Sequence, residues 1–401
     1  MASEPSIQVM GGGGGGGGEE EIREFSSFDD MELPENLLRG IYAYGFEKPS
    51  AVQRKAIVPA LTGRDMIVQA QSGTGKTGTF AITILARLND SKNTQALVLE
   101  PTRELADQSF KVIKALGDYM GVKVYALLKG TPIQQDIATL REGVGVAVGT
   151  PGRVYDMISR GALRMDTLRM FVVDEADQML SLGFKEQLIE IFGTGLSPTA
   201  QIALYSATMP PDALDLTRRF MQSPVKILVP IEKLSLEGIK QFQVEVNEDP
   251  EKAECLDDIY KTLSVSQCMI FCNSCKRVEQ LAKYMEEQNH TVDIIHSELS
   301  PESRELALKS FKAGSTRVLI ASGLLSRGVD VQGLSLVINF DVPRNIEEYL
   351  HRVGRVGRFG RKGVAINIVS RREKGTMKTI EEHYKIEVSA MPSPSELLSS
   401  I

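Results

Sequence analysis

Residues 66–77 decide the fold, and they read Met-Ile-Val-Gln-Ala-Gln-Ser-Gly-Thr-Gly-Lys-Thr. The apolar run 66–69 is typical of a buried strand, and residues 76–88 have the apolar spacing of a helix. The glycine-rich turn between them bares N–H groups at a helix N-terminus, where phosphate oxygens bind. Lys76 can reach the outer phosphates of a nucleotide, and the Thr77 hydroxyl suits Mg²⁺. We predict a strand, a phosphate-binding loop and a helix; the alternative, a chance glycine-rich turn, leaves the flanking elements unexplained.

Short apolar runs alternate with amphipathic stretches on both sides of this unit. Further strand candidates are residues 96–99, 122–128, 144–148, 170–173, 202–205, 267–271, 292–295, 317–321, 334–339 and 364–369. Helical spacing is found in residues 34–44, 104–120, 133–141, 278–287, 304–312 and 346–353. Strands that alternate with helices indicate βαβ units and parallel sheets. The prediction is an α/β protein in which each domain is a parallel sheet flanked by helices.

The chain divides into a tail, two domains and a joint. Residues 1–24 contain a polar start, a glycine block and a run of glutamates at 19–21, and they cannot bury enough surface to offset their chain entropy. We therefore predict a disordered Gly-rich tail at 1–24. Residues 223–239 contain two prolines and show no strong period, which indicates a hinge region. The predicted first domain is 25–225, the flexible linker is 226–238 and the second domain is 239–401.

The composition limits the class of protein. The chain has 401 residues, of which 42% are hydrophobic and 24% charged, and no apolar run approaches the ~18 residues of a membrane span. The net charge of −6 argues against a generally basic nucleic-acid coat protein, so any site for a polyanion must be local. The first 22 residues fit neither a secretory signal nor a transit peptide, and the cysteines are sparse. We expect a reducing compartment, the cytoplasm, with the nucleus as the alternative.

A second motif places acidic residues after a strand. The apolar run 170–173 is followed by Asp174-Glu175-Ala176-Asp177. A carboxylate at the end of a parallel strand, beside a phosphate loop, is suited to Mg²⁺, and a second carboxylate can orient an attacking water. Asp174 is the candidate for the metal and Glu175 the candidate for the water. The alternative is a solvated acidic turn, which the accompanying phosphate loop disfavours.

These motifs together resemble the DEAD-box RNA helicases. Further blocks match in the family's order, and they are residues 45–53, which resemble the adenine-sensing Q motif, then 101–106, 150–153, 206–208 and 351–358. Residues 38–44 and 236–242 are similar to eukaryotic initiation factor 4A and its exon-junction relative. The resemblance runs from Phe28 to the C-terminus. It implies two RecA-like domains and an RNA-dependent ATP hydrolase with ATP and Mg²⁺ as cofactors.

The resemblance also implies roles for individual residues of the nucleotide site. Phe46 stacks on adenine, while Gln53 and Lys48 read its edge. The phosphates are held by Ser72, Gly73, Thr74, Gly75, Lys76 and Thr77, and the metal by Thr77 and Asp174. Asp330 binds the ribose. The catalytic residues implied are Lys76, Asp174, Glu175, Arg355 and Arg358, of which the two arginines act as arginine fingers because a guanidinium stays charged and offers forked donors.

RNA contacts and coupling between the domains follow from the same resemblance. The RNA-binding residues implied are Thr102, Arg103, Gly130, Thr150, Gly152, Arg153, Asn273, Arg304, Ser322 and Gly328, which suit a sugar-phosphate backbone and not base reading. The residues implied in coupling are Ser206, Thr208, Asp177 and His351. A run of basic residues from Arg344 to Lys362, which includes Arg352, predicts a local phosphate-binding patch.

Some positions depart from the family's pattern, and the biological role stays open. Lys129 replaces a glycine, Pro301 stands where a glutamine is frequent, and Ala321-Ser322-Gly323 stands where Thr-Thr-Asp is usual, so we expect weaker RNA coupling. One alternative is a helicase of translation initiation with a scaffold partner of the initiation factor 4G type. The other is an ATP-gated RNA clamp held by exon-junction proteins. In either case we expect a monomer with no membrane partner.

Cys272 and Cys275 form a Cys-x-x-Cys spacing, with Cys268 nearby. The plainest interpretation is that Cys268 and Cys272 share one face of a buried strand as small apolar residues. A redox role for Cys275 at a helix N-terminus is the alternative hypothesis. Zinc at this pair is disfavoured, because no second Cys/His pair stands at ligand spacing.

Overall fold

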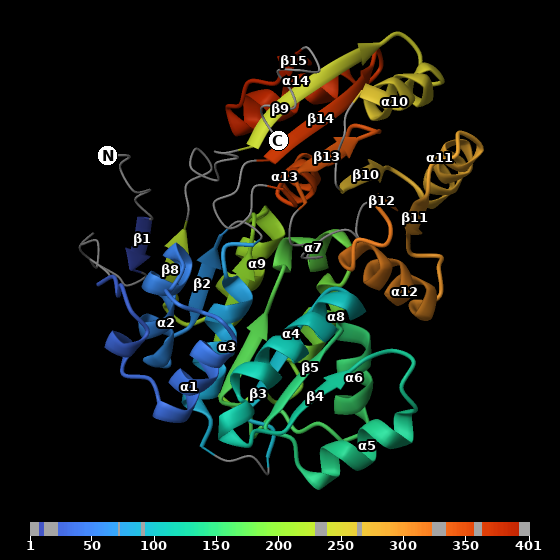
Figure 1. Ribbon diagram of the computed structural model, residues 1–401. Helices are drawn as coiled ribbons and strands as arrows, with labels where there is room; N and C mark the ends of the chain where they lie inside the picture. The colour runs from blue at the N-terminus through green and yellow to red at the C-terminus, as the bar shows by residue number, and fades with distance from the viewer. Residues whose placement is uncertain are drawn as a thin grey trace. The chain divides into compact units, whose positions relative to one another are not determined.

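The structure is a computed structural model that describes residues 8–11, 23–70, 73–89, 93–228, 239–262, 267–322, 334–356 and 363–392 (Figure 1). The chain forms two compact units, Met1–Pro230 and Ile231–Ile401. Each unit contains its own sheet of mostly parallel strands with helices against it. The predicted α/β class with two parallel sheets is confirmed.

The first unit is built on an eight-stranded sheet with the order β1-β8-β2-β7-β6-β3-β5-β4. Its strands are β1 (Gln8–Gly11), β2 (Met66–Gln69), β3 (Ala96–Leu99), β4 (Val124–Leu127), β5 (Val146–Gly149), β6 (Met170–Val173), β7 (Gln201–Ser206) and β8 (Val225–Leu228). Every neighbouring pair is parallel except β1 with β8. The six strands predicted in this half are present, with shifts of the ends. Because β8 runs to Leu228, the sheet continues beyond the predicted end of the first domain at residue 225.

The helices of the first unit connect these strands. They are α1 (Glu35–Ala43), α2 (Ala51–Leu61), α3 (Lys76–Arg87), α4 (Arg103–Leu116), α5 (Ile133–Glu142), α6 (Pro151–Ser159), α7 (Ala176–Ser181), α8 (Lys185–Phe192) and α9 (Pro211–Phe220), with short 3-10 turns at Asp29–Met31 and Asp118–Met120. The predicted helix 104–120 is divided, because α4 ends at Leu116 and Gly117 separates it from the second 3-10 turn.

Part of the predicted disordered tail is instead a strand. Gln8–Gly11 forms β1, which pairs antiparallel with β8 from Gln8 opposite Leu228 to Gly11 opposite Val225 (Figure 1). The physical reason is that β8 otherwise ends the sheet, and the unpaired N–H and C=O groups of an edge strand accept another strand. The rest of residues 1–22 lies outside the described residues.

Both faces of the first sheet are buried. Along β3, Ala96 and Val98 belong to one apolar core, while Leu97 and Leu99 belong to the other. A sheet that is covered on both faces reads as a continuous apolar run, which explains why its strands are recognisable in the sequence. Polar side chains then lie mainly where the strands end, and in open α/β sheets ligands bind at the carboxyl ends of the strands.

The second unit has a seven-stranded sheet with the order β11-β12-β10-β13-β14-β9-β15, in which all pairs are parallel. Its strands are β9 (Ile239–Val246), β10 (Cys268–Cys272), β11 (Val292–Ile295), β12 (Val318–Ser322), β13 (Leu336–Asn339), β14 (Gly363–Ser370) and β15 (Ser389–Ala390). The helices are α10 (Glu251–Thr262), α11 (Cys275–Glu287), α12 (Pro301–Lys312), α13 (Ile346–Val353) and α14 (Lys374–Tyr384). The predicted linker residues 229–238 are outside the described part of the chain. Among the described helices, none is long and apolar enough to cross a bilayer.

Candidate functional site

The predicted phosphate loop lies between β2 and α3. Gly73 and Gly75 have φ angles of +83° and +103°, a backbone region that residues with a Cβ rarely adopt. Gly75 is the N-cap of α3, so the free N–H groups of the first turn of α3 begin at this loop. Thr77 is half-buried in that turn. Ser72 lies outside the described residues.

Gln53 connects the loop to helix α2. Ser50 and Gln53 form a capping box in which Ser50 N donates to Gln53 Oε1 at 2.8 Å. The amide of Gln53 also donates from Nε2 to the carbonyl of Gly75 at 3.4 Å. An amide group keeps one N–H and one lone pair beyond these two bonds, so Gln53 retains the donor and acceptor that an adenine edge needs.

The ring of Phe46 lies over the start of α3. It stacks on Phe28 with a centroid distance of 6.4 Å and an interplanar angle of 18°. A Cβ added at Gly78 would lie 2.6 Å from Gln53 Nε2 and 3.1 Å from the Phe46 ring. Gly78 therefore allows the two predicted adenine residues to approach the helix, a role that sequence reasoning missed. Lys48 is exposed.

Lys76 is buried beside the acidic motif. Its Nζ lies 3.3 Å from Glu175 Oε1, and both side chains are less than a tenth exposed. Burial by itself lowers the pKa of Lys76, but the carboxylates of Glu175, Asp174 and Asp177 outweigh that effect and raise it. The Lys76 ammonium group is therefore held at the phosphate loop by its pairing with Glu175.

Asp174 stands at the end of β6 next to a carboxyl group that the motifs did not reveal. Leu99 pairs with Val173, so Glu100 and Asp174 leave neighbouring strands side by side. Burial, and then the negative charge of Glu175, raise the pKa of Asp174 to about 7. Burial, and then Asp174, raise the pKa of Glu100 well above its usual value. Glu100 also accepts a hydrogen bond from Ser109 Oγ. Carboxyl groups crowded in this way suit a divalent cation, whose charge offsets their repulsion.

Glu175 has a φ angle of +46°, which is uncommon for a residue other than glycine. It is the N-cap of α7, and its N–H donates to Asp174 Oδ1 at 2.9 Å. Left-handed backbone at a non-glycine residue costs free energy, and such positions cluster at functional sites. The turn therefore directs both carboxylates to the edge where the phosphate loop lies.

Three of the predicted coupling residues form one hydrogen-bonded group. Asp177 Oδ2 accepts from Thr208 N at 3.0 Å and from Thr208 Oγ1 at 2.7 Å. Asp177 N donates to Ser206 Oγ at 3.2 Å. Because Ser206 ends β7 and Asp177 opens α7, the group connects the acidic motif to the Ser206-Ala207-Thr208 block.

Two predicted RNA residues of the first unit, Arg103 and Arg153, contact the loop at 129–131. Gly130 has a φ angle of +111°, and a Cβ there would lie 2.9 Å from Arg103 Nη1. Arg103 donates to the carbonyl of Lys129, and Arg153 donates to the carbonyl of Thr131. Arg153 also pairs through Nε with Asp136 at 2.7 Å. The two arginines therefore fix the position of the loop, in addition to the RNA contacts that the resemblance implies for them.

Helices α4 and α6 begin just after the neighbouring strands β3 and β5. Thr102 is the N-cap of α4, and its hydroxyl accepts from Leu105 N at 3.3 Å. Thr150 is the N-cap of α6, and no side-chain bond is made at that cap. Helix N-termini attract anions, because their first N–H groups are unpaired. A Cβ at Gly152 would meet only Gln187 Oε1 at 3.9 Å, so its lack of a side chain is not required by packing.

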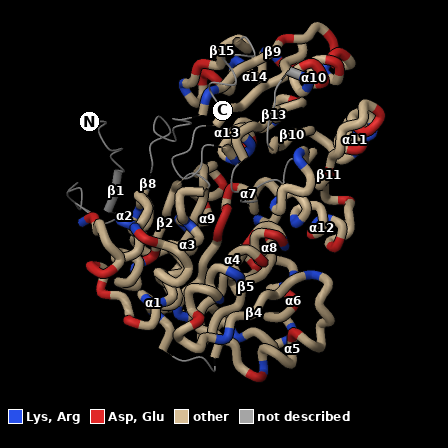
Figure 2. Tube along the Cα trace, in the orientation of Figure 1, with Lys and Arg blue, Asp and Glu red and all other residues tan. Residues whose placement is uncertain are grey.

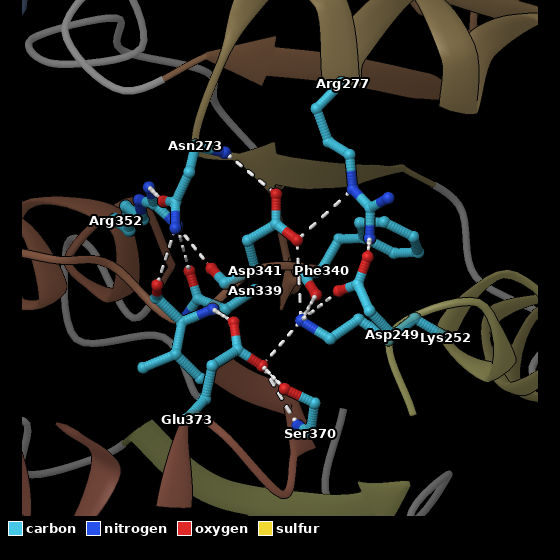
Figure 3. Close-up of polar contacts among 11 residues, drawn as sticks. Asp249, Lys252, Asn273, Arg277, Asn339, Phe340, Asp341, Arg352, Ser370 and Glu373 are labelled. Atoms are coloured by element: carbon cyan, nitrogen blue, oxygen red, sulfur yellow. Dashed lines mark hydrogen bonds and ion pairs between the residues drawn. The ribbon is translucent and has the colours of Figure 1, made fainter. Parts of the chain in front are cut away.

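In the second unit, Asn273 belongs to a network of polar groups at the strand ends (Figure 3). Its N–H donates to Asp341 Oδ2 at 3.0 Å, and its Oδ1 accepts from Arg352 Nη2 at 2.8 Å. Arg352 also pairs with Glu348 at 2.7 Å and is only 1% exposed. The expectation that Arg352 belongs to a surface phosphate patch is therefore wrong. Its guanidinium is used inside the unit, because the helical i,i+4 spacing places Glu348 against it.

The centre of the network is Lys252, which is fully buried. Its Nζ lies 2.6 Å from Glu373 and 3.4 Å from Asp341, and it donates to the carbonyl of Phe340 at 2.9 Å (Figure 3). A cavity of about 360 Å³ beside these groups is lined in part by Asn273 and Arg277. The network therefore sets the position of Asn273, a predicted RNA residue.

The remaining predicted residues are placed as follows. Arg355 donates from Nε to the carbonyl of His351 at 2.9 Å, at the end of α13. Arg304 lies in the first turn of α12, whose N-cap is Ser300. Ser322 ends β12. Gly328, Asp330 and Arg358 lie outside the described residues. Figure 2 shows Lys and Arg interspersed with Asp and Glu along both units, consistent with local and not general basic character.

Comparison with known proteins identifies the class. Residues 50–216 match the family described as DEAD/DEAH box helicase, and residues 251–360 match the helicase conserved C-terminal domain. The chain therefore belongs to the DEAD-box family of ATP-dependent RNA helicases, and it uses ATP and binds RNA.

Several similar curated proteins are named as initiation factor 4A or eIF4A. The chain is 54% identical over 368 residues to eukaryotic initiation factor 4A-1 of Arabidopsis thaliana, covering 92% of this chain and 89% of that protein. It is 53% identical over 367 residues to the ATP-dependent RNA helicase eIF4A of Saccharomyces cerevisiae, covering 91% and 92%. Among solved structures, S. cerevisiae Dbp5 bound to RNA and ADP BeF3 has a TM-score of 0.85 at 31% identity and covers 94% of this chain and 98% of that chain.

Proposed function

We propose that this helicase acts in translation initiation, binds single-stranded RNA without sequence preference, and parts short duplexes as it hydrolyses ATP. The observation that carries the catalytic part is the buried Lys76–Glu175 pair at 3.3 Å, beside Asp174 and at the end of a glycine loop. That pairing places a cation and two carboxylates where a nucleotide's phosphates reach a helix N-terminus.

Each group in the first unit then has a task. Lys76 neutralises the charge that develops on the outer phosphates, and Glu175 orients the attacking water. Thr77 and Asp174 would hold Mg²⁺, and the raised pKa of Asp174 fits a site that gains a divalent cation. When bound, that ion offsets phosphate charge. Phe46, Lys48 and Gln53 select adenine.

Residues of the second unit complete the reaction in this proposal. Arg355 and Arg358 stabilise the transferring phosphoryl group, and Asp330 binds the ribose. Such arginine fingers are worth roughly 10³-fold or more in turnover. His351, with Ser206, Thr208 and Asp177, communicates between RNA and nucleotide. Because the nucleotide site and the arginine fingers belong to different units, and both units are proposed to bind RNA, turnover should depend on RNA.

The proposed RNA site uses backbone groups and short side chains. In the first unit it comprises Thr102, Arg103, Gly130, Thr150, Gly152 and Arg153, and in the second unit Asn273, Arg304, Ser322 and Gly328. The helix N-termini at Thr102 and Thr150 favour phosphate oxygens. Contacts of this kind position a strand without reading its bases.

The initiation role rests on the relatives. Six similar curated proteins are named as initiation factor 4A or eIF4A, and this favours initiation over an exon-junction clamp. We propose a scaffold partner of the initiation factor 4G type and cytoplasmic residence. Affinity purification from cell extract tests this part, because recovery of exon-junction proteins without an initiation scaffold would contradict it.

Turnover assays test the catalytic part. With ATP, RNA should stimulate hydrolysis, whereas GTP should be a poor substrate. Glu175→Gln should lower turnover by ~10²-fold or more and retain ATP binding, because it removes the group that orients water but leaves the phosphate loop intact. The matched control is Glu186→Gln at an exposed position of α8, which should leave both unchanged. Equal rates with GTP, or turnover independent of RNA, would contradict the proposal.

A further inference from the structure

Three side chains able to bind a metal meet at the end of the second sheet. The ligand atoms of Cys275, His296 and Glu298 all lie within 4.8 Å of one another. Cys275 is the first residue of α11, which follows β10, while His296 and Glu298 follow β11 (Figure 1). Strands β10 and β11 both pair with β12 in parallel, so their ends lie together at one edge.

His296 provides an independent indication of a ligand. Its side chain is only 1% exposed. Within the described residues, neither Nδ1 nor Nε2 of its ring has a hydrogen-bond partner. The closest charged group to Nε2 is Glu279 Oε1 at 3.6 Å, which is too long for a hydrogen bond. A buried imidazole without partners is unusual, since buried polar groups are normally satisfied, and a metal ion is one group that satisfies it.

We propose that Cys275, His296 and Glu298 bind one Zn²⁺ ion. A thiolate with an imidazole selects zinc over magnesium or calcium, which prefer oxygen ligands, and a carboxylate is an accepted third ligand. In a tetrahedral zinc site the sulfur and nitrogen ligands lie ~3.5 Å apart, as the bond lengths require. The ligand atoms now lie within 4.8 Å of one another, so binding requires the Cys275 and Glu298 side chains to rotate towards His296; Glu298 is exposed.

The remaining coordination position is open to water or to the Glu279 carboxylate. Glu279 lies on α11 one turn after Cys275, and its side chain is 58% exposed. Binding requires Cys275 as thiolate, so the thiol proton leaves to solvent as the zinc–sulfur bond forms. The hydroxyls of Ser297 and Ser322 lie at hydrogen-bond distance from Cys275 Sγ, at 3.4 Å and 4.0 Å, and each can donate to the thiolate.

This set differs from the Cys-x-x-Cys pair that the sequence displays. Cys272 is fully buried in β10 and belongs to the apolar core of the unit. Cys275 is distant in sequence from His296 and Glu298 and is brought to them by strand register, so no spacing rule reveals the set. None of the three ligands belongs to the nucleotide or RNA residues assigned above, although Cys275 contacts Ser322, a proposed RNA residue.

Titration of the full-length chain with Co²⁺ tests the site. The protein is stripped with a chelator, kept reduced without added thiol, and supplied with excess Mg²⁺ to occupy oxygen-ligand sites. We expect saturation at one Co²⁺ per chain, visible d–d bands, a near-ultraviolet sulfur-to-cobalt band, and displacement by equimolar Zn²⁺. Cys275→Ser should remove the sulfur band and weaken binding at least tenfold, and Glu298→Gln, at an exposed position, should weaken it severalfold.

Cys255→Ser is the matched control, because Cys255 is a partly buried thiol of the same unit and should leave the titration unchanged. Circular dichroism and urea unfolding establish whether each variant is folded. If Cys275→Ser does not fold, Glu298→Gln still tests the site. The proposal is overturned by absence of saturable binding, by a sulfur band that survives Cys275→Ser, or by loss of that band in Cys255→Ser. It is equally overturned if Glu298→Gln binds as tightly as the unchanged chain.

Discussion

Gly78 has little space around it, because a Cβ there would lie 2.6 Å from Gln53 Nε2 and 3.1 Å from the Phe46 ring. Gly78→Ala must displace one of the two proposed adenine residues. We expect its dissociation constant for ATP to rise about tenfold, which corresponds to ~1.4 kcal/mol. Fluorescent-nucleotide titration measures this.

The control for that substitution is Gly375→Ala. Gly375 is also helical, and nothing lies within 4 Å of an added Cβ. Alanine there should leave ATP affinity unchanged and stabilise α14 by roughly 0.5 to 1 kcal/mol. Equal ATP affinity of Gly78→Ala and the unchanged chain would show that Phe46 and Gln53 do not contact the base.

The thiols differ in burial, and we expect them to react at different rates. Burial raises the pKa of Cys268 to about 12, and that of Cys255 to about 11, and it also raises the pKa of the Cys272 thiol. The thiolate is the nucleophile, so at pH 8 iodoacetamide should modify Cys275 first, in the presence of a chelator. Peptide mass spectrometry over time measures the order.

Cys268 and Cys272 should react only when the chain is unfolded in guanidinium, which serves as the reference. Both are confirmed as buried residues on one face of β10. Modification of Cys272 as fast as Cys275 in the folded protein would contradict this and would revive the redox hypothesis for the pair, whose thiols are free here.

At the scale of residues, a site residue can be predicted from the sequence when it lies close in the chain to the rest of its motif. Lys76, Asp174 and Glu175 are identifiable because a contiguous motif contains them or because they directly follow a strand. Glu100 is not, since only the pairing of β3 with β6 brings it beside Asp174. His296 escapes sequence reasoning for the same reason.

At the scale of elements, the buried cation of α10 pairs with carboxylates of two other segments, in addition to the apolar contacts of Leu256 and Ile259. Lys252 lies 2.6 Å from Glu373 and 3.4 Å from Asp341. Lys252→Met leaves those carboxylates without their cation, so we expect the free energy of unfolding of the second unit to fall by about 3 to 5 kcal/mol. Urea unfolding measures it.

Lys374→Met is the comparison for Lys252→Met. Lys374 lies 2.5 Å from Glu245, and both side chains are about half exposed. Its loss should change the free energy of unfolding by less than about 1 kcal/mol. If Lys252→Met were equally mild, Arg277, whose Nε is 3.4 Å from Asp341, would have taken over the pairing, and our account of Lys252 would be wrong.

The strands β8 and β9 are missed from the sequence because neither has a continuous apolar run. Strand β8 follows Pro224 within a stretch whose sequence is typical of a hinge, and its pairing with β2 makes it a strand. In β9, polar residues such as Lys240 and Gln243 interrupt the apolar pattern. By contrast, β2, β3 and β6 have the ends that the sequence predicts, because a doubly covered sheet demands continuous apolar runs.

At the scale of the whole molecule, each unit has an apolar core of its own. We therefore expect separately produced segments 1–230 and 231–401 each to unfold cooperatively in urea. The first should bind ATP, because the phosphate loop and the acidic motif both belong to it. Neither alone should show RNA-stimulated turnover, since the proposed arginine fingers belong to the second.

Mixing the two segments at micromolar concentration should restore little turnover, because a covalent connection supplies an effective concentration of roughly millimolar. The intact chain assayed at the same concentration is the reference. Full RNA-stimulated turnover by segment 1–230 would show that Arg355 and Arg358 are not required.

The pairing of Gln8–Gly11 with β8 has a practical consequence for anyone who purifies this helicase. Trimming the chain to begin after residue 11 removes the only strand that covers that side of β8 in the described sheet. The bared backbone then offers its N–H and C=O groups to the same edge of another copy, and open edges of this kind lead to aggregation. Resistance to aggregation in concentrated solution therefore depends on an N-terminal segment that carries no helicase motif and is easily removed when the chain is shortened.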